Sequence, residues 1–203
     1  MNVKFRTKAE ELYEAIPAHQ RTQHLFETII DDNKDEEVRQ LAAVLLRRLI
    51  FSDFPEIVKS ITEEDFEKIK FQTLLLLEKN ISKNMRQKVC DIAAELAKNC
   101  IDDNGNNSWP QILKFLFDSA NANNLELKHS ALLIFAAVPG VFGNQQTKYL
   151  EVIRQMLIQY LCENSNEEVK ISAVKATSAF ILVHETEKSV LKQMSDCILP
   201  MIH

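Results

Sequence analysis

Glycine and proline, the residues that make tight turns, are scarce in this sequence. The 203 residues include three glycines and five prolines. A β-sheet protein needs many turns and uses both residues more often, so helices joined by short polar connections are favoured. The four cysteines (Cys90, Cys100, Cys162 and Cys197) show no CxxC spacing. This absence argues against a zinc site or a disulfide framework, and we expect buried or free thiols in a reducing compartment.

Long apolar runs and an excess of basic residues are also missing. No stretch approaches the ~20 apolar residues that a membrane helix needs, and the N-terminal MNVKFRTKAEELYEA is too charged for a signal peptide. The net charge of −5 gives no basic footprint for nucleic acid. An acidic chain is better suited to basic partners. We therefore expect a soluble intracellular protein that binds neither membranes nor nucleic acid.

Catalytic motifs are absent as well. The sequence contains no GxGxxG, P-loop, GxSxG or HExxH. The segment 102–108 (DDNGNNS) fails as a calcium loop, because its first and twelfth positions would be Cys100 and Gln111. Three acidic pairs begin predicted helices, where carboxylates oppose the helix dipole: Glu36/Glu37, Glu63/Glu64 and Glu167/Glu168. Without convergent ionisable groups we expect no enzyme, no cofactor and no metal site.

A short motif recurs along the chain: an apolar residue, a base, any two residues, then a small apolar residue. It appears as FRTKA (5–9), VRQLA (38–42), MRQKV (85–89), LKHSA (127–131) and VKISA (169–173). A recurrence at intervals of about 40 residues is the signature of HEAT or armadillo-type helical repeats. Each copy opens a helix with apolar residues at i, i+3, i+4 and i+7.

A second helix precedes each copy after the first, at about 19–31, 64–79, 109–121 and 146–163, and a last one covers about 187–199. We call the earlier helix of each pair A and the later one B. The pattern predicts one all-α domain over 1–203, an α-solenoid of about five HEAT repeats. The expected units are 1–17 (B only), 18–54, 62–102, 108–140, 144–184 and 187–203 (A only). Both ends therefore look cut, which would leave Phe5, Leu12 and Ile16 partly bare.

Several stretches resemble the importin-β superfamily. They are MRQKVCDIAAELAKNCIDDNGNNSWPQILKFLFDS (85–119), EEVRQLAAVLLRRLI (36–50), VPGVFGNQQTKYLEVI (138–153) and KAEELYEAIP (8–17). The resemblance implies the N-terminal part of a nuclear import receptor that shuttles between cytoplasm and nucleus. Such receptors bind the small GTPase Ran in its GTP form, which releases basic cargo carried through the nuclear pore. The alternative is a HEAT scaffold of another complex, such as a phosphatase, and GTP-dependent Ran binding would discriminate the two.

The resemblance also implies site residues. The Ran-facing candidates lie on the B helices: Glu10, Arg39, Gln40, Arg47, Arg86, Asp91, Glu95, Asn99 and Lys128. Pockets for Phe-Gly repeats of nucleoporins would lie between A helices, near Phe71, Leu75, Phe115 and Phe117, all of which could equally be core.

The residues alone leave some roles open. Arg39, Arg86 and Lys128 share one motif slot, so they either pair with acids between helices, such as Asp35, or form a basic row for an acidic partner. The polar faces of the second and third B helices are either solvated or used for binding. Trp109 is either a packing residue or a surface anchor.

Overall fold

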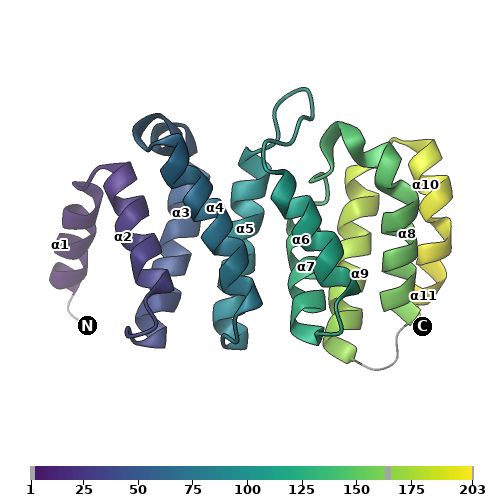
Figure 1. The fold of residues 1–203 in the computed structure, drawn as a ribbon, viewed down its shortest axis with the longest axis horizontal. Coiled ribbons are helices and arrows are strands. Elements are labelled where there is room, and N and C mark those ends of the chain that lie inside the picture. The colour runs from purple at the N-terminus through teal and green to yellow at the C-terminus, as the bar shows by residue number, and fades with distance from the viewer. Residues whose placement is uncertain (1–2, 163–165, 203) are drawn as a thin grey trace.

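The computed structural model describes residues 3–162 and 166–202. Helical hairpins stand side by side in one row, with the two termini at opposite ends (Figure 1). Within those residues, the β-structure is limited to an isolated bridge between Ile101 and Asn107. The predicted all-α solenoid is confirmed.

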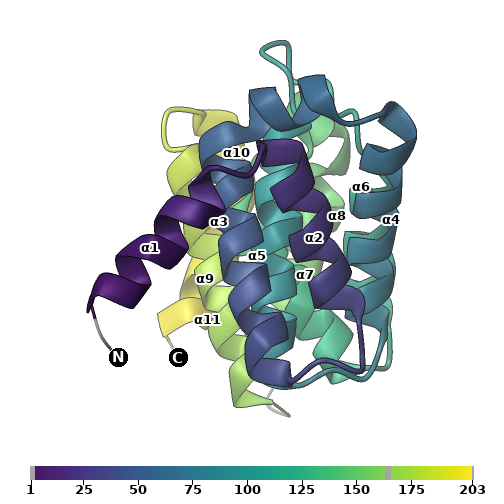
Figure 2. The same cartoon turned by 90° about the vertical axis from the view of Figure 1, so that its left-hand side faces the viewer.

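The A and B helices form two layers, seen end-on in Figure 2. The A helices are α2 (Ala18–Ile30), α4 (Glu63–Glu78), α6 (Pro110–Asn121) and α8 (Gln146–Cys162). The B helices are α1 (Val3–Glu14), α3 (Glu36–Ser60), α5 (Lys83–Asn99), α7 (Leu125–Ala137) and α9 (Glu167–Val183). The remaining elements are η1 (Gly143–Gln145), α10 (Lys188–Met194), η2 (Ser195–Cys197) and α11 (Ile198–Ile202).

The hydrophobic core runs between the two layers. Helix α3 packs on α5, α5 on α7, and α7 on α9, while each A helix packs on the B helix of its own pair. Leu46, Leu77, Ile112 and Phe180 are fully buried. A single amphipathic hairpin could not bury these residues alone, so the repeats stabilise one another.

Local signals explain where the helices begin. The side chains of Thr62, Ser82, Asn124 and Asn166 accept hydrogen bonds from backbone N–H groups in the first turns of α4, α5, α7 and α9. These caps satisfy donors that have no partner within the helix. The three acidic pairs lie in the first turns of α3, α4 and α9, as predicted.

Two helix bounds differ from the prediction. Helix α3 continues to Ser60, beyond the predicted end of that unit at residue 54, with a kink at Asp53 (φ −127°, ψ 18°). Pro55 causes the kink because it lacks an N–H and its ring crowds the preceding turn. The buried Ile57 holds the extension in place. The predicted helix over 187–199 is also interrupted, by η2 between α10 and α11.

Most of the aromatic side chains between the layers and three of the four cysteines are buried. Phe115, Phe135, Phe142 and Phe180 are buried, and Phe117 is half-buried against the core. Trp109 is 1% exposed, so it is a packing residue rather than a surface anchor. Cys90, Cys100 and Cys197 are buried free thiols, and Cys162 is exposed. Burial raises the pKa of Cys90 to about 12 and that of Cys197 to about 11, which keeps both thiols protonated and unreactive.

The segment 102–108 is a structured loop that binds the next connection. The Asp102 carboxylate accepts hydrogen bonds from the Asn106 side-chain amide and from the backbone N–H groups of Asn106 and Asn104, and these bonds lower its pKa. The Gly105 carbonyl then accepts the Asn144 N–H at 2.9 Å. This contact joins the loop after α5 to the turn before α8.

Replacing Gly143 by alanine should break this contact. A Cβ at Gly143 would lie 2.0 Å from the Gly105 carbonyl oxygen, and its φ is +51°. We expect Gly143→Ala to lower the free energy of unfolding by about 2 kcal/mol, measured by urea denaturation. Gly140→Ala is the matched control, because a Cβ there meets nothing within 4 Å. Equal stability of the two variants would contradict the prediction.

Candidate partner-binding surface

The candidate surface is the inner face, which we define as the side of α3, α5, α7 and α9 turned away from the A helices. Residues on a helix three and four apart share a face, so the exposed positions of the B helices form adjacent stripes. The sequence predicted that polar and charged side chains would cover these stripes. The structure places some of the predicted residues there and buries others.

Arg39 and Arg86 point between helices rather than outward. The Arg39 Nε donates to the Ile29 carbonyl at 2.9 Å, and its guanidinium lies 2.9 Å from the Asp32 carboxylate. Arg86, 4% exposed, donates to the carbonyls of Leu77 at 2.6 Å and Lys79 at 3.0 Å. Both arginines satisfy the last carbonyls of an A helix.

Arg39 and Arg86 therefore pair with groups of neighbouring helices, which is one of the two roles that the sequence left open for them. The acid beside Arg39 is Asp32, however, not the predicted Asp35. Lys128 occupies the same slot differently: its ammonium lies 5.4 Å from the centre of the Tyr160 ring. The Tyr160 hydroxyl donates to the Ala120 carbonyl at the end of α6, so the tyrosine takes the capping role that arginine has in α3 and α5.

Glu95 is also buried, at 4% exposed, where an exposed residue was predicted. The reason is its two basic neighbours: Arg47 Nε lies 3.9 Å and Lys98 Nζ 3.6 Å from its carboxylate. The Arg47 side chain itself remains 53% exposed. Asn99 is exposed and donates its amide to the Glu95 carbonyl at 2.9 Å.

The other predicted polar residues remain accessible. Glu10 is exposed on α1, and Gln40 and Asp91 are half-buried. Gln40 donates to Glu36 at 2.6 Å, and Asp91 accepts from Gln87 at 3.1 Å, in each case one turn along the same helix. The inner face thus offers Gln40, Arg47, Asp91 and Asn99 from two adjacent helices.

Charged residues also tie the beginnings of the B helices together. Ser82 donates to Glu36 across α3 and α5, and Lys83 pairs with Glu168 across α5 and α9. Hydrogen bonds from Ser82 and Lys83, respectively, lower the pKa of Glu36 and of Glu168. His129 on α7 lies beside Lys83 and Glu168. Burial lowers the pKa of this histidine. This edge is a structural network that spans four repeats, from α3 to α9.

Sequence reasoning missed the apolar part of the inner face. On α3, Leu41 is 60%, Val44 47% and Phe51 75% exposed. On α9, Ile171 and Leu182 are similarly open. Helix α3 carries apolar residues around most of its circumference. Its hydrophobic periodicity therefore did not separate core positions from surface positions. Mixed polar and apolar exposure is typical of protein–protein interfaces.

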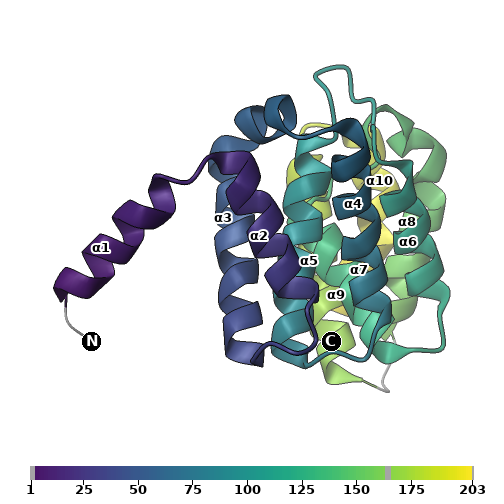
Figure 3. The same cartoon turned by 60° about the vertical axis from the view of Figure 1, so that its left-hand side comes forward.

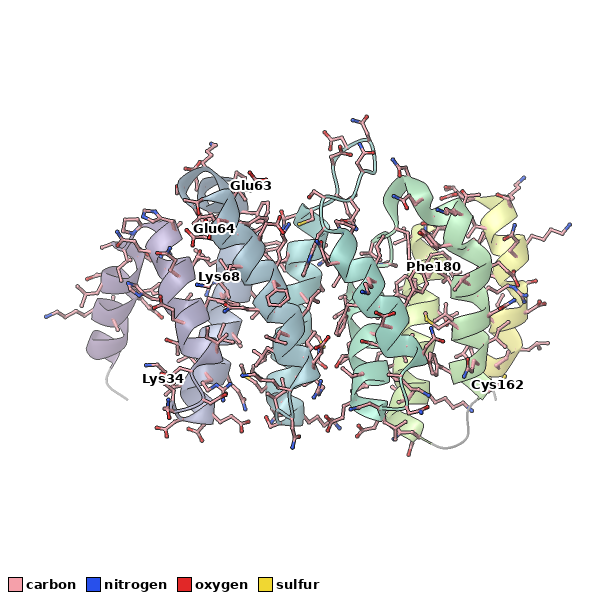
Figure 4. All side chains as sticks on the ribbon, in the orientation of Figure 1. Lys34, Glu63, Glu64, Lys68, Cys162 and Phe180 are labelled. Atoms are coloured by element: carbon pink, nitrogen blue, oxygen red, sulfur yellow. The ribbon has the colours of Figure 1, made fainter. Side chains whose placement is uncertain are left out.

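The outer face has shallow grooves between A helices. Phe71 and Leu75 on α4 are 66% and 42% exposed. A cavity of about 460 Å³ between α4 and α6 is lined by Phe71, Leu74 and Trp109, with Glu64 and Lys68 at its edge; Figure 4 shows both charged side chains on α4.

Phe115 and Phe117 do not contribute to this groove. Phe115 is 7% exposed. The Phe117 ring packs 5.5 Å from Phe142 and 5.4 Å from Tyr149. Both were predicted as pocket residues or core, and the structure places them in and against the core because α7 and α8 cover that side of α6.

A metal site requires a cluster of ligand side chains, and a membrane-spanning segment requires a long apolar helix. The described ranges contain no cluster of three or more His, Cys, Asp or Glu side chains that could hold a metal ion. Among these residues, every helix is too short or too polar to span a bilayer.

Two family models match consecutive parts of the chain. The model described as "Importin-beta N-terminal domain" matches residues 10–79, and that described as "IPO5-like, TPR repeats" matches residues 81–203. The second match alone covers more than half of the chain. The chain belongs to the importin-β family. The resemblance carried by residues 85–119 is thereby confirmed.

Individual relatives agree with the family assignment. This importin-β family chain is 24% identical over 199 residues to "Probable importin-5 homolog" of Dictyostelium discoideum, covering 96% of the chain and 18% of the relative. The crystal structure of Kap121p matches with a TM-score of 0.78 at 21% identity, over 98% of the chain and 19% of Kap121p. Kap121p bound to Nup53p matches with a TM-score of 0.77 at the same identity and coverage. The chain thus spans about a fifth of the length of the relatives it matches.

Proposed function

We propose that this chain is the Ran-binding region of a nuclear import receptor. The observation that carries the proposal is the match of residues 10–79 to the importin-β N-terminal domain, the region that contains α2, α3 and α4. The proposed receptor shuttles between cytoplasm and nucleus and carries basic cargo, which Ran-GTP releases. A binding protein needs no chemistry to sense the GTP state; it needs only different contacts with the two conformations of its partner.

The inner face supports the proposal. We assign contacts with Ran to Glu10, Gln40, Arg47, Asp91 and Asn99, whereas Lys128 packs over Tyr160 of α8. Arg39, Arg86 and Glu95 hold the helices that present these residues. The exposed apolar side chains of α3 provide the desolvated centre that stable interfaces require.

The outer groove is proposed to bind Phe-Gly segments of nucleoporins. Phe71 and the Trp109 side chain border an apolar depression beside Leu74, of a size that accepts one aromatic ring. Kap121p, which shares the fold, has been crystallised bound to Nup53p. Leu75 lines a smaller depression on the other side of α4, with Ile30 and Leu76.

Charge reversal at Arg47 should weaken Ran binding. Arg47 is exposed and lies beside the Glu95 carboxylate. A glutamate at position 47 would therefore place two negative charges side by side on the proposed contact surface. We expect the wild-type chain to prefer Ran loaded with a non-hydrolysable GTP analogue over Ran–GDP. We expect Arg47→Glu to raise the Kd for the GTP form about tenfold, measured by calorimetry at physiological salt.

The control reverses an exposed charge elsewhere, Lys188→Glu at the start of α10, and should leave the Kd unchanged. Equal binding of the GTP and GDP forms, or no binding by a folded chain, would count against the proposal and favour a HEAT scaffold of another complex.

A further inference from the structure

Helix α3 has an unpartnered strip on the side that faces α1. Leu41, Leu45, Arg48 and Ser52 are spaced i, i+4, i+7 and i+11, so they share one face of the helix. Leu45, Arg48 and Ser52 border a cavity of about 490 Å³, whose opposite wall includes Tyr13 on α1. Leu41 lies one turn earlier, where α1 has diverged from α3 (Figure 3), and is 60% exposed.

Helix α1 has an unpartnered apolar face of its own. Ala9 and Leu12 are spaced i and i+3 on α1, and Ile16 follows in the connection 15–17; Leu12 is 62% and Ile16 37% exposed. The helix has 12 residues, and a helix of that length is only marginally stable in water without tertiary packing. Two bare apolar surfaces therefore face solvent, one on α1 and one on α3, and the short connection 15–17 joins α1 to α2.

The other B helices show what such surfaces do in this fold. Helices α5, α7 and α9 each pack on the B helix before them, and α3 is covered in this way on one side, by α5. A further B helix on the other side of α3 would continue the same stack. Helix α1 precedes α3 by one hairpin and runs in the same direction (Figure 3).

We infer that α1 is a hinged arm that closes onto the Leu41–Leu45–Arg48–Ser52 strip of α3. Closing fills the cavity, covers Leu41 and buries Leu12 and Ile16. The movement is a swing at residues 15–17 combined with a turn of α1 about its axis, because Glu10, Tyr13 and Glu14 now line the cavity while Leu12 and Ile16 do not.

Two features hold the open position seen here. The Arg21 guanidinium lies 5.0 Å from the centre of the Tyr13 ring, a cation–π distance. Pro17 has an extended conformation (φ −54°, ψ 143°), and a proline also favours an extended conformation in the residue before it. Open and closed arms present different surfaces: Leu41 is available to a partner when the arm is open and covered when it is closed.

Amide hydrogen exchange of the whole chain tests the arm. An unpacked α1 would exchange at close to the rate of an unfolded peptide, whereas an arm closed for about nine-tenths of the time slows its amides about tenfold. We expect that slowing in the wild-type chain. Leu41→Asp should abolish it, because a carboxylate on the strip opposes the burial of Leu12 and Ile16.

The matched control is Leu182→Asp, the same substitution at a leucine that is 65% exposed on α9. It should leave α1 exchange unchanged, and amides of α5 and α7 should stay protected in both variants, which shows that the solenoid remains folded. Fast exchange of α1 in the wild-type chain, or slow exchange that survives Leu41→Asp, overturns the inference. Protection that rises with protein concentration also overturns it, since a second copy would then be the occupant.

Discussion

Replacing Phe135 by alanine should lower the free energy of unfolding by about 3–5 kcal/mol, the range for deleting a fully buried phenylalanine ring. Phe135 on α7 is 2% exposed. Its ring lies 6.0 Å from Phe142, in the connection after α7, and 5.6 Å from Phe180 on α9. The resulting cavity would open between two adjacent repeats, where close packing leaves little room for collapse. Urea denaturation followed by circular dichroism measures the loss.

The matched control is Phe71→Ala on α4, where the ring is 66% exposed. Its free energy of unfolding should change by no more than about 0.5 kcal/mol. The same variant should weaken binding of a Phe-Gly peptide if the outer groove is used as proposed, so one substitution separates stability from binding. A loss of stability at Phe71 comparable to that at Phe135 would show that the outer groove is part of the core.

The repeat architecture was predictable because local patterns carry it. The motif at 38–42 and its later copies mark the first turn or two of α3, α5, α7 and α9, where a hydrophobic stripe, a capping residue and a base coincide. Scarce glycine and proline excluded sheets, and most of the rare breakers that remain fall at helix starts or in connections, with Pro55 at the kink of α3. The position of α1 was not predictable, because it depends on a hinge of three residues rather than on the helix pattern.

The site was less predictable, since a helical pattern gives the direction of a side chain but not its distance from the next repeat. Glu95 and Asp91 are one turn apart on α5, yet Glu95 is buried beneath Arg47 and Lys98 while Asp91 is half-exposed. Arg86 is long enough to reach back to the end of α4. On α3 the apolar residues outnumber the core positions, so Phe51 could not be recognised as exposed.

The role of Arg86 as a brace between repeats leads to the second large effect. Its guanidinium donates to the Leu77 and Lys79 carbonyls at the end of α4, and to Glu126 on α7 at 2.8 Å. Arg86→Ala would leave the buried Leu77 carbonyl without this donor, would remove one of the two donors to the Lys79 carbonyl, and would break the link from α4 through α5 to α7. We expect the free energy of unfolding to fall by about 3 kcal/mol, measured by urea denaturation.

Arg47→Ala, on the B helix of the preceding repeat, is the matched control. The Arg47 side chain is 53% exposed, and its charged neighbour Glu95 lies at 3.9 Å, so its loss should change the free energy of unfolding by no more than about 0.5 kcal/mol. The two arginines should then exchange roles in binding. Below its unfolding transition, Arg86→Ala should keep its affinity for Ran-GTP, whereas Arg47→Ala should lose part of it. The opposite result, a stable Arg86→Ala variant that no longer binds, would mean that Arg86 leaves its buried position to contact the partner directly.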